Sequence, residues 1–391
     1  MNADPLGRPV RVLSLYPTFW PRQGGGQMVL AAIAEGLSPQ ISNVVLTRQL
    51  HDTPPHQNYE FLSVERFWNP APAVWKEYAT GVDHVPFWKK TIVTGLDVFC
   101  ALPSLRRLSR ESDLVHLHFP LPLGVSALMM RPFVRRPLLV TVHGNADVYE
   151  LPRAMEPITR AVLTRADAVV SVSHDLARYL HDVMHVRNVT VIPNGVDVEQ
   201  FHPGNRAGGD LALFSISRLV PRKNVDILIA AVAQLAREGT PVSLTIAGTG
   251  PEEDRIRQLS ERLPGTVRFV GFVDEARKRQ ILREVDVFVQ LSIREGLSIA
   301  TLEALASGVP SVVSDLPGVR EPITAGETGW YVANPQDVES VVSALRRVLA
   351  DRERLPAMKR ASRAVAVERY SLQAMCQSYW NVYADLLRHR S

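Results

Sequence analysis

Cysteine is scarce in this chain of 391 residues, which contains only Cys100 and Cys376. The two lie far apart and show no Cys-x-x-Cys or Cys/His spacing, so neither a disulfide framework nor a zinc site is predicted. No apolar run reaches the ~18 residues that a membrane-spanning helix needs, and the polar stretch 1–9 lacks the apolar core of a signal peptide. We therefore expect a cytoplasmic protein that does not cross a membrane.

An excess of one charge is also lacking. The chain has 44 Lys and Arg against 40 Asp and Glu, a formal net charge of +4. A nucleic-acid partner requires basic residues clustered on one face, so this small excess does not favour one. It does permit weak attraction to an anionic membrane surface, at the cytosolic face. No Asp-x-Asp pair occurs to hold the divalent ion of a nucleotide, so no metal is expected.

Short β-branched runs alternate with longer helical patterns along the whole chain, which is typical of parallel sheets covered by helices on both faces. The sequence therefore predicts an α/β fold with two parallel sheets. The expected strands of the first half are Val10–Leu15, Asn43–Leu46, Leu114–His118, Leu138–Val142, Ala168–Val172 and Val189–Ile192. Those of the second half are Leu211–Ile216, Ser243–Ala247, Val267–Val270, Val285–Val289 and Ser311–Val313.

The turn Pro193-Asn194-Gly195 and the Gly, Pro and Asn residues that follow it divide the chain nearly in two. We expect an N-terminal domain over 1–195, a linker over 196–209 and a C-terminal domain over 210–370. Apolar residues at helical spacing predict a final helix within 371–391 that docks on a domain. Two similar sheets facing each other imply a cleft.

In open α/β sheets, ligands bind beyond the carboxyl ends of the strands, so the residues there are the candidates for a site. After the first strand, Gly24, Gly25 and Gly26 precede an apolar helix, where bare backbone can approach a phosphate. His143 ends another strand and could hydrogen-bond a polar substrate, or be a buried imidazole. His116 and His118 are expected to face opposite ways and so not to share a metal.

The second half holds the charged candidates. Arg218 and Lys223 flank the end of the strand 211–216, just before a helix expected to begin near Asn224, where two cations would neutralise a diphosphate. Glu295 precedes another helix, and Glu303 lies inside that apolar helix. Burying the Glu303 charge requires a partner, such as a pair of hydroxyls.

Glu295 and Glu303 form a Glu-x7-Glu pattern, and the sequence resembles family 4 of the retaining glycosyltransferases, the group 1 proteins. This resemblance implies the GT-B fold, in which two Rossmann-like domains face each other across a cleft. The resemblance runs over most of the chain. The other shared motifs, in order, are Gly24–Gly26, Thr141-Val142-His143, Pro193-Asn194-Gly195-Val196-Asp197 with Phe201, Arg218 with Lys223, Ala247-Gly248-Thr249-Gly250-Pro251 and Gly271.

The resemblance implies a nucleotide-sugar donor, with UDP or GDP as the leaving group, and a hydroxyl acceptor. Glu303 would hold the ribose hydroxyls, Glu295 the transferred sugar, and Arg218 and Lys223 the diphosphate in place of a metal. The remaining implied contacts to the donor come from Gly296, Leu297 and Ser298, from Gly248, from His143, and from Gly25 and Gly26. The resemblance also implies that the last helix packs back on the N-terminal domain.

Ser298 stands where the family has a second glycine, so it narrows the room for the sugar or serves as the N-cap of the next helix. The acceptor side, between Leu50 and Leu105, contains aromatic and basic residues that could form a lip for a lipid-linked acceptor and dock on a membrane, or could be ordinary core. These residues are Phe67, Trp68, Trp75, Tyr78, Phe87, Trp88, Lys89 and Lys90.

Two other functions remain alternatives at this point. One is a sugar-nucleotide epimerase or hydrolase of the same architecture, which would release nucleotide with no acceptor. The other is a nucleotide-sugar binding protein without catalysis, which the joint presence of Glu295, Arg218 and Lys223 disfavours.

Overall fold

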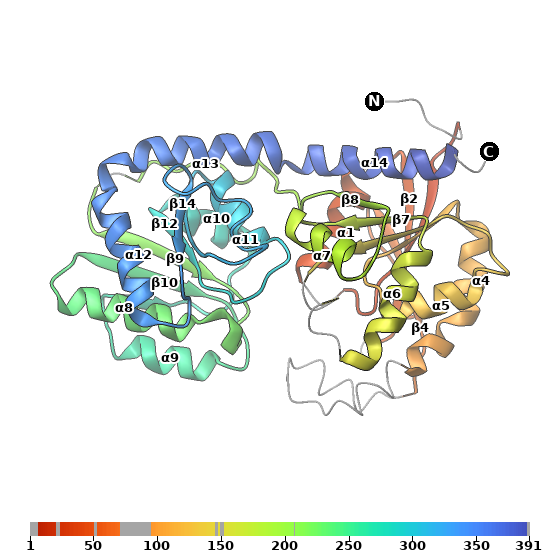
Figure 1. Ribbon diagram of the computed structural model, residues 1–391, viewed down its shortest axis with the longest axis horizontal. Helices are drawn as coiled ribbons and strands as arrows, with labels where there is room; N and C mark the ends of the chain where they lie inside the picture. Colours follow the sequence, from red (N-terminus) through yellow and green to blue (C-terminus); the bar gives the residue numbers. More distant parts are fainter. Residues whose placement is uncertain are drawn as a thin grey trace. The chain divides into compact units, whose positions relative to one another are not determined.

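The computed structural model describes residues 7–20, 24–50, 53–70, 95–144, 148, 152–206 and 208–388. The chain forms two compact units, each with its own sheet (Figure 1). Unit 1 comprises Met1–Pro193 together with Gln373–Ser391, and unit 2 comprises Asn194–Leu372. The expectation of two α/β domains is confirmed.

The sheet of unit 1 has the strand order β3-β4-β2-β1-β5-β6-β7-β8, and only β3 runs antiparallel to its neighbour. Central strands such as β6 are buried along their whole length, as parallel strands covered on both faces must be. The strands are β1 (Val10–Leu15), β2 (Ile41–Arg48), β3 (His56–Asn58), β4 (Leu62–Phe67), β5 (Leu114–Leu117), β6 (Leu138–Val142), β7 (Ala168–Ser171) and β8 (Val189–Val191).

The edge strand β3 and its neighbour β4 were not among the predicted strands. β4 alternates buried apolar residues with the half-buried Ser63 and Glu65, as strands near a sheet edge do, so it lacks the continuous apolar run of the central strands. The helices of unit 1 are α1 (Gly25–Gly36), α4 (Leu102–Glu111), α5 (Leu123–Met130), α6 (Glu156–Arg165), α7 (His174–Asp182) and α14 (Leu372–Arg388).

The last helix, α14, lies along unit 1, as expected (Figure 1). Its side chains Tyr379 and Tyr383 are fully buried. The hydroxyl of Tyr383 lies 2.8 Å from Nδ1 of His116 on β5, and Cys376 packs against Gly36 at the end of α1. A hydrogen bond and close packing therefore join α14 to the first half of the chain.

The sheet of unit 2 is entirely parallel, with the strand order β11-β10-β9-β12-β13-β14. The strand order reverses between β9 and β12, the arrangement of a doubly wound sheet. β14, which was not predicted, combines a glycine with aromatic residues. The strands are β9 (Leu211–Ile216), β10 (Val242–Ala247), β11 (Val267–Phe269), β12 (Val287–Gln290), β13 (Ser311–Ser314) and β14 (Gly329–Val332).

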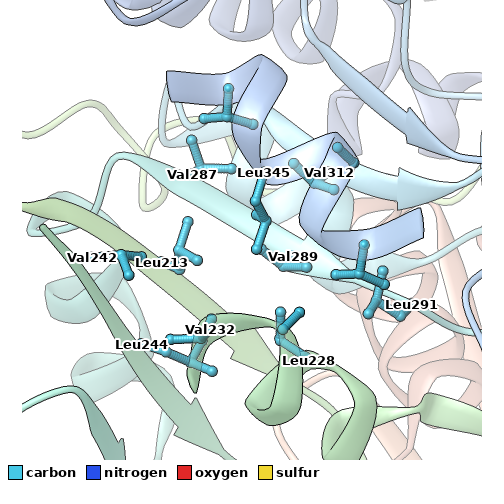
Figure 2. Packing of buried hydrophobic residues seen from close by; sticks show 14 of the residues in the cluster. Leu213, Leu228, Val232, Val242, Leu244, Val287, Val289, Leu291, Val312 and Leu345 are labelled. Carbon is cyan, nitrogen blue, oxygen red and sulfur yellow. The ribbon is translucent and has the colours of Figure 1, made fainter. Parts of the chain in front are cut away.

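Helices cover both faces of this second sheet. α8 (Val225–Arg237), α9 (Glu253–Glu261) and α12 (Val338–Ala350) lie on one face, and α10 (Glu275–Arg283), α11 (Ile299–Ala306) and α13 (Leu355–Arg369) on the other (Figure 1). Between the sheet and the first group, the strand residues Leu213 and Val289 pack against Val232 of α8 and Leu345 of α12 (Figure 2). This apolar core holds the central strands in place.

Much of the stretch expected to be a linker packs on unit 2. Phe201 is buried, and Arg206 donates a hydrogen bond of 2.9 Å to the carboxylate of Asp286. Val196 pairs with Ser371 across an isolated bridge. The boundary between the units therefore falls at the two chain crossings, after Pro193 and after Leu372.

Gly248, directly after β10, lies where two loops of unit 2 approach closely. Its φ is +130°, and a Cβ built there would lie 1.9 Å from the carbonyl oxygen of Ser217. The backbone amide of Leu219 donates to the carbonyl of Thr249 at 2.8 Å, which fixes the loops together. Only glycine fits this position.

Replacing Gly248 by alanine should therefore destabilise unit 2 by about 3 kcal/mol, because a strained backbone and a clash with a carbonyl act together. Gly239→Ala is the matched control, since Gly239 also has a positive φ (+78°) but no atom within 4 Å of the place that a Cβ would take, and it should cost about 1–2 kcal/mol. Differential scanning calorimetry of the two variants measures the difference. Equal costs would contradict the close approach.

Candidate functional site

The candidate site of unit 2 lies at the carboxyl ends of β9 and β12, where the strand order reverses. Two segments leave the sheet there and are joined by hydrogen bonds. The backbone amide of Ile293 donates to the carbonyl of Arg222 at 3.0 Å, and the Asn224 side chain donates to the carbonyl of Leu291 at 2.8 Å. Asn224 has a φ of +51° and forms the N-cap of α8, which begins at Val225. The fold thus brings residues 217–224 and 291–298 together.

Lys223 and Glu295 form an ion pair across these two segments, with Lys223 Nζ bonded to Glu295 Oε1. Their side chains are 12% and 21% exposed, so a ligand can reach both while water is largely excluded. Arg218 follows the end of β9 and is exposed. The sequence predicted that these three residues act at one site, and the structure places all three beyond the same two strands.

Gln290, the last residue of β12, organises this region and was missed by the sequence analysis. It is buried, and its amide nitrogen donates to Glu295 Oε1 at 3.1 Å. Its amide oxygen accepts from the hydroxyls of Ser298 at 2.6 Å and Thr301 at 2.8 Å. A polar residue within an apolar strand was the only signal that could have pointed to it. Gln290 therefore orients both the Glu295 carboxylate and the start of α11.

Ser298 is the N-cap of α11, which confirms one of the two alternatives predicted for it. Its Oγ accepts a hydrogen bond from the amide of Thr301 at 3.2 Å, while its own proton goes to Gln290. The carbonyl of the preceding Leu297 accepts from the side chain of Asn194 at 3.0 Å. Gly296, Leu297 and Ser298 are all buried, so this stretch of backbone is held rigidly.

Glu303 lies in the middle of α11 and is 2% exposed. Its Oε1 accepts a hydrogen bond of 2.7 Å from Nζ of Lys278 on α10. Burial raises the pKa of Glu303 to about 7, and the attraction and hydrogen bond of Lys278 act in the opposite direction. The burial of this carboxylate was expected from the sequence to need a partner. Lys278 is such a partner, and it was not predicted.

In unit 1, Gly24 is the N-cap of α1, which begins at Gly25. No side chain caps the helix and no acidic residue lies in its first turn, so its N-terminus keeps its positive potential. A Cβ on Gly26 would lie 2.6 Å from the hydroxyl of Tyr16 and 3.3 Å from the ring of Phe119. Gly26 therefore lets aromatic side chains approach the start of the helix.

His143 follows β6, and its Nε2 lies 3.1 Å from Nδ1 of His118, with the two rings stacked. Burial lowers the pKa of His143 to about 3, so the imidazole is neutral at neutral pH. The expectation that His116 and His118 face opposite ways is wrong, since their ring centroids are 4.0 Å apart. Residues two apart on a strand point to the same face.

His116 is a satisfied core residue. It contacts the hydroxyls of Tyr383 and Thr141, each at 2.8 Å, and it is fully buried. Within the described ranges, no three His, Cys, Asp or Glu side chains are grouped as a metal ion would require. None of the described helices is both long and apolar enough to span a membrane.

The predicted aromatic and basic lip is only partly described. Phe67, the last residue of β4, is buried core, whereas Trp68 is 69% exposed. The other residues of the lip lie outside the described residues: Trp75, Tyr78, Phe87, Trp88, Lys89 and Lys90.

Comparison with known proteins identifies the family. The family model for glycosyl transferases group 1 matches residues 197–365, and the model for glycosyltransferase family 4 matches residues 23–200. A phosphatidyl-myo-inositol mannosyltransferase of Mycolicibacterium smegmatis is 30% identical over 279 residues, covering 70% of this chain and 71% of the relative. A glycogen synthase of Mycobacterium tuberculosis is 28% identical over 288 residues, covering 70% and 69%.

Solved structures agree on the fold. Sucrose-phosphate synthase from Thermosynechococcus elongatus superposes with a TM-score of 0.82 at 20% identity, covering 97% of this chain and all of that one. HepE from Anabaena, in complex with UDP, gives a TM-score of 0.75 at 19% identity, covering 96% and 100%. The chain therefore belongs to family 4 of the glycosyltransferases and has the GT-B fold that its sequence predicted.

Proposed function

We propose that this protein moves a sugar, with retention of configuration, from a nucleotide-diphosphate sugar to a hydroxyl acceptor, without a metal ion. The observation that carries the proposal is the half-buried Lys223–Glu295 pair, held beside the start of α11 at the point of strand reversal. It places a cation, a carboxylate and a helix N-terminus together where doubly wound sheets bind ligands.

Each residue has a distinct role in this proposal. Glu303 accepts hydrogen bonds from the ribose hydroxyls, and Glu295 binds the transferred sugar together with the backbone of 296–298. Arg218 and Lys223 stabilise the negative charge that grows on the diphosphate as the bond to the anomeric carbon breaks. Fixed charges of this kind lower the barrier because they need no reorganisation during the reaction.

Retention is proposed to follow from substitution on one face of the sugar, with the leaving phosphate helping to deprotonate the acceptor. His143, Gly25 and Gly26 belong to unit 1, and their contacts with the donor stay predictions. The neutral state of His143 fits a residue that exchanges hydrogen bonds with sugar hydroxyls rather than charge with phosphate.

The donor is proposed to carry UDP or GDP. HepE was solved with UDP, and a relative of Mycobacterium tuberculosis that is 31% identical over 288 residues is described as GDP-mannose-dependent. The acceptor is proposed to belong to glycolipid, polysaccharide or natural-product glycoside synthesis in the cytoplasm. A lipid-linked acceptor reached at the cytosolic face of the membrane is one form of it, supported by the names of the mannosyltransferase relatives.

Glu295→Ala and Lys223→Ala should each reduce sugar transfer by about 10²–10³-fold, because each removes a fixed charge at the reacting centre. Glu238→Ala removes a carboxylate from an exposed pair with Arg346 and is the matched control, which should retain full activity. The assay measures nucleotide release with and without added acceptor, and circular dichroism checks the fold. Near-native turnover by both variants would contradict the site, and acceptor-independent release would favour a hydrolase or epimerase.

A thermal-shift series with UDP, GDP, ADP and TDP tests the donor. A nucleotide at a hundredfold excess over its Kd should stabilise the protein by about 2.7 kcal/mol, since it binds only the folded state. The shift should be the same with EDTA present and should be lost in Glu303→Ala. A shift that EDTA abolishes would contradict metal independence, and no shift with any nucleotide would contradict the donor site.

A further inference from the structure

Lys278 is a buried lysine on α10 that no motif of the family resemblance includes. The residue is 7% exposed, and its ammonium lies 5.5 Å from the centre of the Phe201 ring. Nζ donates two hydrogen bonds to carboxylates, one of 2.8 Å to Glu275 and one of 2.7 Å to Glu303. Because an ammonium group loses its hydration when buried, this placement needs an explanation.

The bond to Glu275 does not provide that explanation. The Glu275 side chain is 52% exposed and lies one helical turn away on the same helix, and pairs of this kind contribute little. The Glu303 side chain is 3% exposed and comes from another helix. Two buried charges of opposite sign stabilise each other only when they are in contact. The burial of Lys278 is therefore explained by its contact with the Glu303 carboxylate.

Few other charges face the Glu303 carboxylate among the described residues. α10 contributes Glu275, which opposes the ionised form, and Arg279, which favours it more weakly than Lys278. From α13, Arg363 directs its guanidinium to the backbone carbonyls of Phe201 and Ala306. Lys278 is the cation that hydrogen-bonds the carboxylate directly.

We propose that Lys278 is a positioning residue for the nucleotide: it favours the charged form of the Glu303 carboxylate and holds this group in the orientation that accepts the ribose hydroxyls. This inference rests on the proposed function, in which Glu303 binds the ribose. A charged carboxylate accepts hydrogen bonds on both oxygens, whereas a protonated one must donate at one of them. Without Lys278, burial alone would favour the protonated form at neutral pH.

The preference of the site for ribose over 2′-deoxyribose isolates this effect. Isothermal titration calorimetry gives the Kd of UDP, GDP and ADP and of their 2′-deoxy counterparts between pH 6 and pH 9. The ratio of the two affinities is the readout, because the diphosphate titrates equally in both ligands. In the native protein the preference should rise with pH through about 7, as the carboxylate ionises.

In Lys278→Met this rise should move to higher pH. Because the native pKa of Glu303 is about 7, a displacement of one pKa unit lowers its charged fraction at pH 7 about fivefold, from about one half to about one eleventh. The ribose preference at pH 7 should fall by about that factor and recover towards pH 9. Lys278→Arg, which keeps the charge, should restore the native profile. Lys359→Met removes a lysine that pairs with Asp286 at 3.2 Å and is the matched control, with a native profile expected.

A native pH profile in Lys278→Met would overturn the proposal. If that variant does not fold, Lys278→Gln replaces it, since it keeps a hydrogen-bond donor but no charge. The variant Glu303→Ala shows whether a negative result concerns the role of Lys278 or the ribose assignment of the proposed function. An unchanged ribose preference in Glu303→Ala means that the ribose assignment itself is wrong, whereas a preference lost there but native in Lys278→Met rejects only the role of Lys278.

Discussion

The reversal of strand order between β9 and β12 is the constraint on which the candidate site depends. Strands to either side of the reversal send their connections in opposite directions, so the loops at their carboxyl ends separate and leave room for a ligand. Residues 72 positions apart in the sequence, Lys223 and Glu295, meet there. Unit 1 has the same reversal between β1 and β5, and its glycine-rich helix start and His118 follow these two strands.

The two carboxylates of the Glu-x7-Glu pattern are each neutralised by a lysine from another segment of the chain. Glu295 is bonded to Lys223 from the loop after β9, and Glu303 to Lys278 from α10. Each carboxylate is also on or beside α11, a helix whose start is held by Ser298 and Gln290. The charges of the site are therefore compensated by the folded chain itself, which permits their burial in a low-dielectric environment.

Strong local patterns were readable from the sequence. β1, β6 and β9 have the limits predicted from their β-branched runs, and the Glu-x7-Glu pattern and the cap Ser298 were found through the resemblance to the family's motif. Lys278 and Gln290 were not found, because their partners are chosen by packing between elements. The polar Gln290 at the end of an apolar strand was a local signal, but it does not identify a partner, and Lys278 carried no such signal. β3 and β4 escaped because strands near an edge, exposed in part, resemble loops in composition.

The docking of α14 on unit 1 has a consequence for the order in which this chain is made. Domains generally fold as units during synthesis, the N-terminal one first. Here the packing of unit 1 cannot be completed until α14 has left the ribosome. Tyr379 and Tyr383 of α14 are buried in unit 1, and the hydroxyl of Tyr383 is hydrogen-bonded to His116. Unit 2 is one continuous segment, so it can fold completely while unit 1 still lacks α14. Loss of the segment Gln373–Ser391 would therefore damage the domain that is translated first.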